Sequence, residues 1–356
     1  MSDFQIHGGD VYRREGILDF SANINPLGMP PEVLEAALRG VRESGHYPDP
    51  ENRELTRAYA AFHDVTPQMI IFGNGAAELI RALPLVLKAE RGGLVLPTFG
   101  EYEAGMKLAG TEITEVSFED AKSGKLPEKL DLVMLGNPNN PDGRVFSRGE
   151  ICRLAENYPE TRFLIDESFL SFAMDEQERD CIPALGAHEN LLVLRSFTKI
   201  YAMPGLRLGA LLGADAGVIS ALKNFLQPWT VSRPAQLAGV AALAQTDFVK
   251  RTREFLTNER PWLAEKIGVL PDVDLVLSSP ADFLLFHVKE KEAHGLYFAL
   301  LEKNIQVRDC TSFTGMSRLD ERTGETGWYR IAVRSREDNQ KLLAAMQETA
   351  RNWRYS

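Results

Sequence analysis

The sequence predicts an α/β protein with a large domain and a smaller α+β domain. The chain has 356 residues, which is long enough for more than one domain. Short apolar runs alternate with helical stretches from about residue 69 to residue 212, and many of these runs are apolar throughout. Such runs are typical of strands in a sheet that helices cover on both faces. After about residue 214 the pattern changes to a long helical stretch and then to a mixed unit.

The elements expected before and within the large sheet follow from hydrophobic periodicity. An amphipathic helix is predicted over Pro30–Ser44, with its apolar residues at helical spacing, and a second helix over Glu51–His63. The predicted strands are Met69–Phe72, Gly93–Leu96, Leu132–Leu135, Phe163–Ile165, Leu191–Leu194 and Leu208–Leu212.

The second part of the chain has a different pattern. A helical stretch is expected over residues 214–267, interrupted near Pro228 and Pro234. Strands are then expected at Val273–Leu277, Phe283–Val288, Ile305–Arg308 and Tyr329–Val333, with helices Ala293–Glu302 and Arg336–Trp353 between and after them. We expect three parts: residues 1–45 as an arm and helix that contribute to the small domain, 46–250 as the large domain, and 251–356 as the small domain.

Composition excludes several classes of function. The 40 Lys and Arg residues against 50 Asp and Glu residues give a net charge of −10, which argues against nucleic acid or an anionic membrane as a partner. Cys152, Cys181 and Cys310 are far apart, so neither a metal site nor a disulfide framework is indicated. No window reaches the roughly 18 apolar residues of a membrane span. These features favour a cytoplasmic protein.

The segment from Arg195 to Gly209 carries the most chemical information. Ser196, Thr198 and Arg207 place two hydroxyls and a guanidinium near the amine of Lys199. This set suits a phosphate monoester held beside a lysine. A desolvated lysine has a lowered pKa and can form a Schiff base with an aldehyde.

The same segment resembles the S-x-x-K-x-x-x-x-P-G-x-R-x-G motif of fold-type I pyridoxal phosphate enzymes. The resemblance implies pyridoxal 5'-phosphate as cofactor, with Lys199 bonded to it and Arg207 near its phosphate. It also implies that the large domain binds the cofactor and contains a mainly parallel sheet of about seven strands.

Two further stretches match the family in the required order. Gly136–Gly143 resembles its N-P-N-N-P-T-G loop, so Asn140 would bind the 3-oxygen of the cofactor, with Asp142 in place of the usual Thr. The apolar run before Asp166 ends in acids, and Asp166 would face the pyridine nitrogen and keep it protonated. Phe169 stands where many relatives have a Tyr that bonds the 3-oxygen.

Other cofactor contacts follow from the resemblance. The turn containing Gly75, Ala76 and Ala77 would hold the phosphate at a helix N-terminus. Tyr102 matches the aromatic residue that stacks on the pyridine ring. Tyr47, in Tyr-Pro-Asp-Pro, matches a residue that reaches the cofactor phosphate of the neighbouring subunit, which implies a homodimer.

The substrate side is similar to the threonine-phosphate decarboxylase family of cobalamin biosynthesis, a near relative of histidinol-phosphate aminotransferase. The similarity rests on His7-Gly8-Gly9 and on the run from Leu18 to Pro30. It implies that the substrate, a small phosphorylated amino acid, contacts His7, Gly8, Asn23 and Asn140, its phosphate Arg308 and its carboxylate Arg330, with Arg334 adding charge.

Lys199 and Asp166 would be the catalytic residues in each of the reactions that remain open. The first is decarboxylation of L-threonine O-3-phosphate to (R)-1-aminopropan-2-ol O-2-phosphate, and a variant of it takes L-serine O-phosphate to ethanolamine phosphate. The second is a histidinol-phosphate-type transamination. A catalytically silent binding protein is a third possibility, against which the retained lysine argues.

Overall fold

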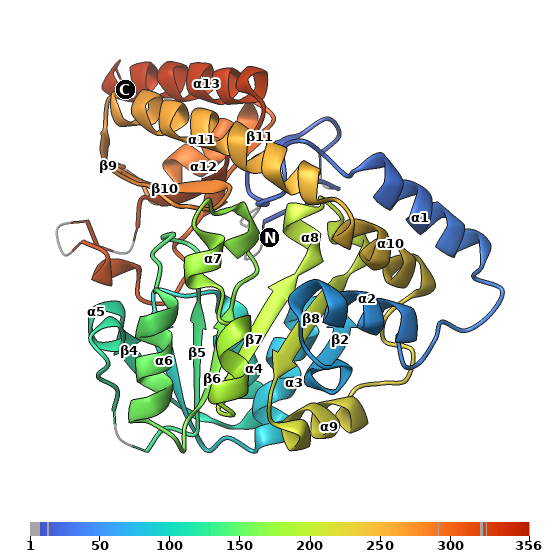
Figure 1. Ribbon diagram of the computed structural model, residues 1–356. Helices are drawn as coiled ribbons and strands as arrows, with labels where there is room; N and C mark the ends of the chain where they lie inside the picture. The colour runs from blue at the N-terminus through green and yellow to red at the C-terminus, as the bar shows by residue number, and fades with distance from the viewer. Residues whose placement is uncertain are drawn as a thin grey trace.

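The computed structural model describes residues 8–12, 14–127, 129–290, 292–320, 323–324 and 326–355. Figure 1 shows a large sheet with helices around it in the lower part of the molecule and a smaller unit above it. The described part of the chain contains no helix with the length and apolar character needed to cross a membrane.

The large sheet has seven strands in the order β2-β8-β7-β6-β5-β3-β4. Only β8 runs antiparallel to its neighbours, so the expectation of a mainly parallel seven-stranded sheet is confirmed. The strands are β2 Ile70–Asn74, β3 Arg91–Leu96, β4 Glu112–Ser117, β5 Leu132–Gly136, β6 Arg162–Asp166, β7 Leu191–Ser196 and β8 Leu208–Gly213.

Strand β4 is the member of this sheet that apolar runs did not indicate. It lies at the edge of the sheet, and most of its residues are exposed or half-buried. Its sequence, Glu-Ile-Thr-Glu-Val-Ser, therefore alternates between polar and apolar residues, whereas the central strands are buried on both faces.

Both faces of the sheet are packed. In β6, Phe163 and Ile165 belong to one buried cluster and Leu164 to another, because successive strand side chains point to opposite faces. The first cluster joins the sheet to α2, α6 and α10, and the second joins it to α3, α4 and α9. The helices up to the small unit are α1 Pro31–Arg42, α2 Arg53–His63, α3 Ala76–Leu87, α4 Gly100–Ala109, α5 Phe118–Lys122, α6 Arg148–Asn157, α7 Glu176–Arg179, α8 Phe197–Ile200, α9 Ala216–Phe225, α10 Arg233–Leu243 and α11 Thr246–Gly268.

The long helical stretch consists of α9, α10 and α11. Pro228 lies between the first two helices, and Pro234 is in the first turn of α10, where proline loses no helical hydrogen bond. Helix α11 runs without a break across the expected domain boundary at 250/251. Helix α1 packs along α10, and a side chain at Gly40 would collide with the backbone of Pro234.

The small unit has an antiparallel sheet in the order β12-β13-β10-β9. Its elements are β9 Val273–Leu277, β10 Phe283–Val288, α12 Gly295–Glu302, β12 Arg308–Asp309, β13 Trp328–Ala332 and α13 Arg336–Tyr355. The strand expected at Ile305–Arg308 is divided, because β11 Ile305–Gln306 pairs instead with β1 Leu18–Asp19 from the N-terminal arm. Short 3-10 helices occupy Pro67–Met69, Leu170–Phe172, Ile182–Ala187, Pro204–Leu206 and Met316–Arg318.

Candidate active site

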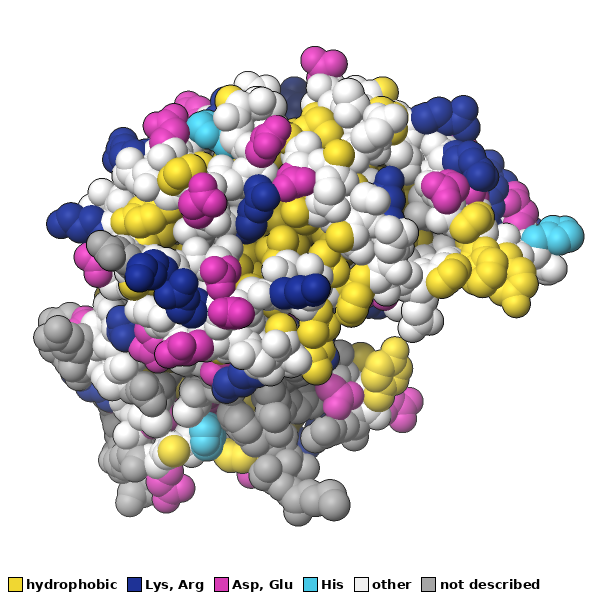
Figure 2. Space-filling model, turned by 90° about the horizontal axis from the view of Figure 1, so that it is seen from below, with side chains coloured by type: hydrophobic (Ala, Val, Ile, Leu, Met, Phe, Trp, Pro, Cys, Tyr) yellow, Lys and Arg dark blue, Asp and Glu magenta, His cyan; other side chains and the backbone are white. Residues whose placement is uncertain are grey.

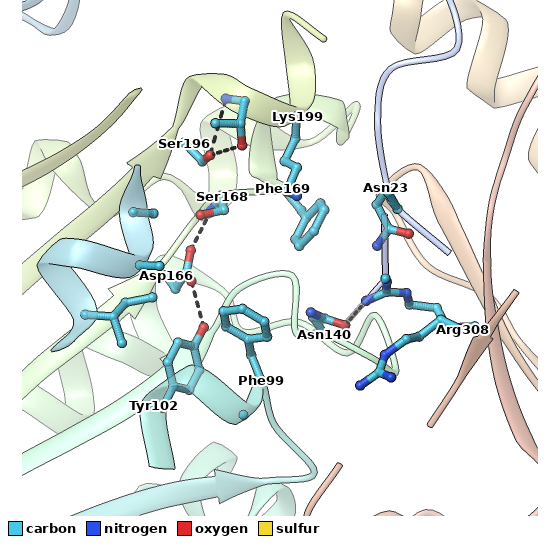
Figure 3. Close-up of a pocket in the computed structure, with 18 of the residues that line it drawn as sticks. Asn23, Phe99, Tyr102, Asn140, Asp166, Ser168, Phe169, Ser196, Lys199 and Arg308 are labelled. Carbon is cyan, nitrogen blue, oxygen red and sulfur yellow. Dashed lines mark hydrogen bonds between the residues drawn. The ribbon is translucent and has the colours of Figure 1, made fainter. Parts of the chain in front are cut away.

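A cavity of about 260 Å³ lies between the large sheet and the small unit, where β3, β5, β6 and β7 end. Ligands of open α/β sheets gather at this edge. Figure 3 shows part of its wall. The predicted site residues that line it are Gly8, Asn23, Ala76, Ala77, Tyr102, Asn140, Asp166, Ser196, Thr198, Lys199, Arg207, Arg308 and Arg330.

Lys199 belongs to α8, the short helix that follows β7, and its side chain extends into the cavity (Figure 3). Burial, together with the nearby cations Arg330 and Arg207, lowers the pKa of its amine to about 8, while Asp282 and Asp166 oppose this shift. A lysine with this pKa is partly neutral at neutral pH and can attack an aldehyde.

Asp166 ends β6 beside the same cavity. Its carboxylate accepts hydrogen bonds from the Tyr102 hydroxyl at 2.8 Å and from the Ser168 backbone N–H at 2.9 Å. Burial raises the pKa of Asp166, and these hydrogen bonds and Lys199 oppose the rise. A cationic ring nitrogen facing the carboxylate would stabilise its ionised form.

The Tyr102 hydroxyl is therefore engaged with Asp166, and a second aromatic residue also lines the cavity. Phe99, one turn earlier, meets Tyr102 edge to face with ring centroids 5.7 Å apart. Figure 3 shows the two rings together below Asp166. The contact with the pyridine ring that is expected of Tyr102 can thus also come from Phe99, to which the sequence analysis gave no role.

An anion cradle lies beside Lys199. Gly75 precedes α3 with a φ of +79°, and a Cβ there would lie 2.2 Å from an Nη atom of Arg207. The amides of Ala76 and Ala77 begin the helix, where N–H groups have no intrahelical acceptor. The hydroxyls of Ser196 and Thr198 are hydrogen-bonded to each other at 2.7 Å and line the same cavity.

Tyr47 lies outside this cavity. Its side chain is 79% exposed, and its ring stacks on Trp229 with centroids 4.5 Å apart. Within one chain it therefore contributes nothing to the site, and the role in a neighbouring subunit stays a prediction.

Asn140 and Arg330 are joined across the cavity. Arg330, on β13, donates hydrogen bonds to the side-chain oxygen of Asn140 and to the backbone oxygen of Ser21. Burial lowers the pKa of Arg330 to about 10. The Asn140 loop is also fixed by hydrogen bonds within it, since the buried Asp142 accepts one from Asn139 at 2.8 Å and one from Arg144 at 2.7 Å. The Asp that replaces the usual Thr thus forms an ion pair with Arg144.

The other substrate-side residues are less uniformly placed. Arg308 lies opposite Arg330 in the β12–β13 pair, donates to the Ser312 hydroxyl at 2.7 Å and lies over the Phe313 ring. Asn23 lines the cavity and is buried, and within the described chain its amide nitrogen and oxygen have no hydrogen-bond partner. His7 lies outside the described residues.

The structure does not bring Arg334 to the cavity. Its guanidinium pairs with Asp338 at 3.0 Å, in the first turn of α13, and donates to the backbone oxygen of Asp19 at 3.0 Å. Its position two residues beyond the end of β13 turns it toward that helix, so its proposed contact with substrate lacks geometric support.

Several cavity residues had no role in the sequence-based site. They include Phe99, Ser168, Ser312 and Phe313. Each lies within a few residues of a predicted site residue, at a strand end or just beyond it. Proximity to a motif was therefore an available signal, but the residue types alone indicate no chemistry.

The residues present fit pyridoxal 5'-phosphate. The lysine, the anion cradle, the buried carboxylate and the unpartnered Asn23 amide converge on one cavity. The fold and this set of residues define a fold-type I pyridoxal phosphate enzyme.

Comparison with known proteins agrees with this class. Residues 15–346 match the family described as aminotransferase class I and II. A threonine-phosphate decarboxylase from Salmonella typhimurium is 34% identical over 96% of this chain and 95% of its own. The chain therefore belongs to the class I and II aminotransferase family, and pyridoxal phosphate is its cofactor.

Two solved structures show the same architecture. The histidinol-phosphate aminotransferase from Clostridium acetobutylicum has a TM-score of 0.85 and 26% identity, covering 94% of this chain and 100% of the other. The L-threonine-O-3-phosphate decarboxylase from Porphyromonas gingivalis has a TM-score of 0.84 and 25% identity, covering 93% and 99%. Both activities thus occur on this fold.

Proposed function

We propose that the protein decarboxylates L-threonine O-3-phosphate to (R)-1-aminopropan-2-ol O-2-phosphate, which is used for the cobalamin nucleotide loop. The observation that carries a small phosphorylated amino acid as the substrate is the pairing of Arg308 with Arg330 on adjacent strands, with both guanidiniums at the cavity that contains Lys199. A substrate with a carboxylate and a dianionic phosphate requires two such cations. The Salmonella typhimurium relative, whose name is threonine-phosphate decarboxylase, supports decarboxylation as the reaction.

Bound pyridoxal phosphate supplies an electron sink for the bond that breaks at the substrate α-carbon. Arg330 would hold the carboxylate that leaves as carbon dioxide, and Arg308 would hold the phosphate. Asp166 would keep its negative charge at the cofactor's ring nitrogen. Lys199 would then donate the proton that replaces the carboxylate on the α-carbon, so the reaction consumes one proton and releases one carbon dioxide.

The proposal includes a homodimer in which Tyr47 completes the neighbouring site. Tyr47, Trp229 and Phe225 are large, exposed and hydrophobic. Figure 2 shows hydrophobic side chains gathered at the right-hand end of the molecule, on the side where Figure 1 places the loop between α1 and α2 that contains Tyr47. A cytoplasmic location also belongs to the proposal, consistent with three free cysteines.

L-serine O-phosphate is the second substrate that the same site accommodates. It lacks one methyl group, which a pocket distinguishes by only about 1 to 3 kcal/mol. The ratio of kcat/KM for the two phosphates would identify the preferred one.

The deciding experiment supplies the cofactor-loaded protein with each phosphate and follows carbon dioxide and the amine product. Release of carbon dioxide from either phosphate supports decarboxylation. Absence of carbon dioxide, together with transfer of the amino group of histidinol phosphate to 2-oxoglutarate to form glutamate, would overturn it.

Transamination is the second candidate because the aminotransferase from Clostridium acetobutylicum matches this fold as well as the decarboxylase does. Histidinol phosphate presents a phosphate for one arginine, and glutamate presents carboxylates for both. The two arginines alone therefore do not separate the reactions, and the products do.

A further inference from the structure

Asp282 is a buried carboxylate that has no role in the chemistry described so far, and it directly precedes Phe283, whose ring packs edge to face on Phe169 of the cavity wall with centroids 5.2 Å apart. It directly precedes β10, its side chain is fully buried, and its backbone oxygen accepts a hydrogen bond from Val333 at 2.7 Å. Among the described residues, neither of its carboxylate oxygens has a hydrogen-bond partner. A buried carboxylate without a hydrogen-bond partner is costly, so its presence at this position points to a use.

The cations that act electrostatically on Asp282 come from three elements. They are Lys199 on α8, Arg330 on β13 and Arg260 on α11. Arg260 is occupied with the backbone oxygens of Pro280 and Ala281, and Arg330 with Asn140 and Ser21. Within the described chain the Lys199 amine makes no hydrogen bond or ion pair, and of the three cations it has the strongest influence on Asp282.

The influence is reciprocal. Burial lowers the pKa of Lys199, and Asp282 is the foremost group that raises it again, ahead of Asp166. Burial raises the pKa of Asp282 to about 7, and Lys199 is the foremost group that opposes this rise. With cofactor bound, Asp166 would be committed to the ring nitrogen. Of the two carboxylates that raise the pKa of Lys199, Asp282 is then the one left to act on the lysine.

We propose that Asp282 is a positioning residue that keeps the amine of Lys199 protonated, so that Lys199 donates a proton to the α-carbon instead of removing one. This inference rests on the proposed decarboxylase function. Decarboxylation needs an acid at the α-carbon after carbon dioxide has left, whereas transamination begins with a neutral amine acting as base. The carboxylate of Asp282 favours the ammonium form through its negative charge.

The substrate strengthens this bias. Arg330 disfavours the ammonium form of Lys199, and a bound carboxylate would neutralise that cation. Asp282 would then act on Lys199 with less opposition while the substrate is in place. Arg207, the other cation that lowers the pKa of Lys199, would be similarly neutralised by the cofactor phosphate.

The test compares Asp282→Asn with wild type, both loaded with cofactor. The substitution keeps the shape and removes the charge. Its first readout is the pH titration of the visible absorption band, which changes when the Lys199 nitrogen gains or loses a proton. The midpoint is expected at lower pH in the variant, because an anion that favours the protonated nitrogen is gone.

The second readout is the partition of the substrate between two fates. In deuterated water we expect exchange of the α-hydrogen to rise relative to carbon dioxide release by about tenfold in the variant. Asp274→Asn is the matched control: it removes a carboxylate from the neighbouring β9 that pairs with His287, and both readouts should equal wild type. Thermal melting separates a folding defect from a local effect.

The outcomes distinguish the two proposals. If wild type releases carbon dioxide and Asp282→Asn changes neither the absorption midpoint nor the partition, the role of Asp282 is overturned and the decarboxylase function stands. If wild type releases no carbon dioxide, both proposals fail.

Discussion

The guanidinium of Arg330 donates a hydrogen bond to the side-chain oxygen of Asn140. This bond joins β13 of the small unit to the loop after β5 of the large sheet, and a second bond from Arg330 at 2.7 Å adds Ser21 of the N-terminal arm. Three segments that are distant in sequence therefore meet at one side chain. The position of a substrate carboxylate bound to Arg330 would therefore depend on all three segments.

Arg330→Lys should weaken this junction and the substrate site together. Lysine keeps the charge but cannot make the two-pronged contact of a guanidinium. We expect kcat/KM to fall by about tenfold to a hundredfold, as for the loss of one charge-assisted bond. Arg334→Lys, whose side chain lies outside the cavity, should change kcat/KM by less than about threefold. Equal losses in the two variants would contradict the assignment of Arg330.

Lys199→Ala should abolish the covalent link to the cofactor. Turnover is expected to fall by about a thousandfold or more, because the variant has no amine at the reacting carbon. The absorption band of the cofactor-bound protein should be lost, while the melting temperature stays near that of the wild type without cofactor. Retention of the band would place the reactive lysine elsewhere.

Tyr102→Phe should separate the hydroxyl from the ring. The variant loses the 2.8 Å bond to Asp166, and a buried hydrogen bond to a charged group contributes about 1.5 to 3 kcal/mol. We expect kcat to fall by about tenfold with a smaller change in substrate KM. Phe99→Leu is the companion variant, since it removes an aromatic ring and leaves the Asp166 bond intact. A larger loss of cofactor affinity in Phe99→Leu than in Tyr102→Phe would assign ring stacking to Phe99.

Stability should depend on pH through Asp282. Burial raises the pKa of this carboxyl to about 7, so its contribution to stability is full below the ordinary aspartate pKa and is lost as pH rises through about 7. Asp282→Asn removes that loss. The free energy of unfolding of the variant relative to wild type should therefore increase between pH 5 and pH 8, by about 1 to 4 kcal/mol. Urea titrations at both pH values measure the difference, and a constant difference would show that Asp282 does not ionise in this range.

Shared sites can be tested with hybrid dimers. If Tyr47 serves the neighbouring subunit, Tyr47→Ala and Lys199→Ala chains are each impaired, but their hybrid has one site with both residues intact. Random mixing in equal amounts should restore about a quarter of the wild-type sites. No recovery on mixing, with dimers present by native mass spectrometry, would contradict the role of Tyr47.

Sequence alone located the elements whose burial is uniform. The central strands β5, β6 and β7 are apolar throughout because both faces are covered, and the site residues at their ends follow from the same pattern. The edge strand β4 was missed, since its exposed face needs polar residues.

Tertiary relations were not readable in the same way. The motif around Tyr102 indicates an aromatic at the site, but its hydroxyl partner depends on how α4 packs against β6. Arg334 and Arg330 look alike in sequence, and they separate only where β13 ends and Asp338 becomes available. Asp282 belongs to no motif, and its electrostatic interaction with Lys199 depends on how the small unit packs on the large sheet.

The pairing of Arg308 with Arg330 also has a metric consequence. Residues opposite one another in antiparallel strands have Cα atoms about 4.5 to 5.5 Å apart, and the backbone ladder keeps that spacing constant. Under the proposed function, this fixed spacing sets the distance between the substrate carboxylate and the substrate phosphate that the two arginines can bind together. L-homoserine O-phosphate carries both of the charges that the site binds, but its phosphate is one carbon further from its carboxylate. We therefore expect it to be a poor substrate because of its length.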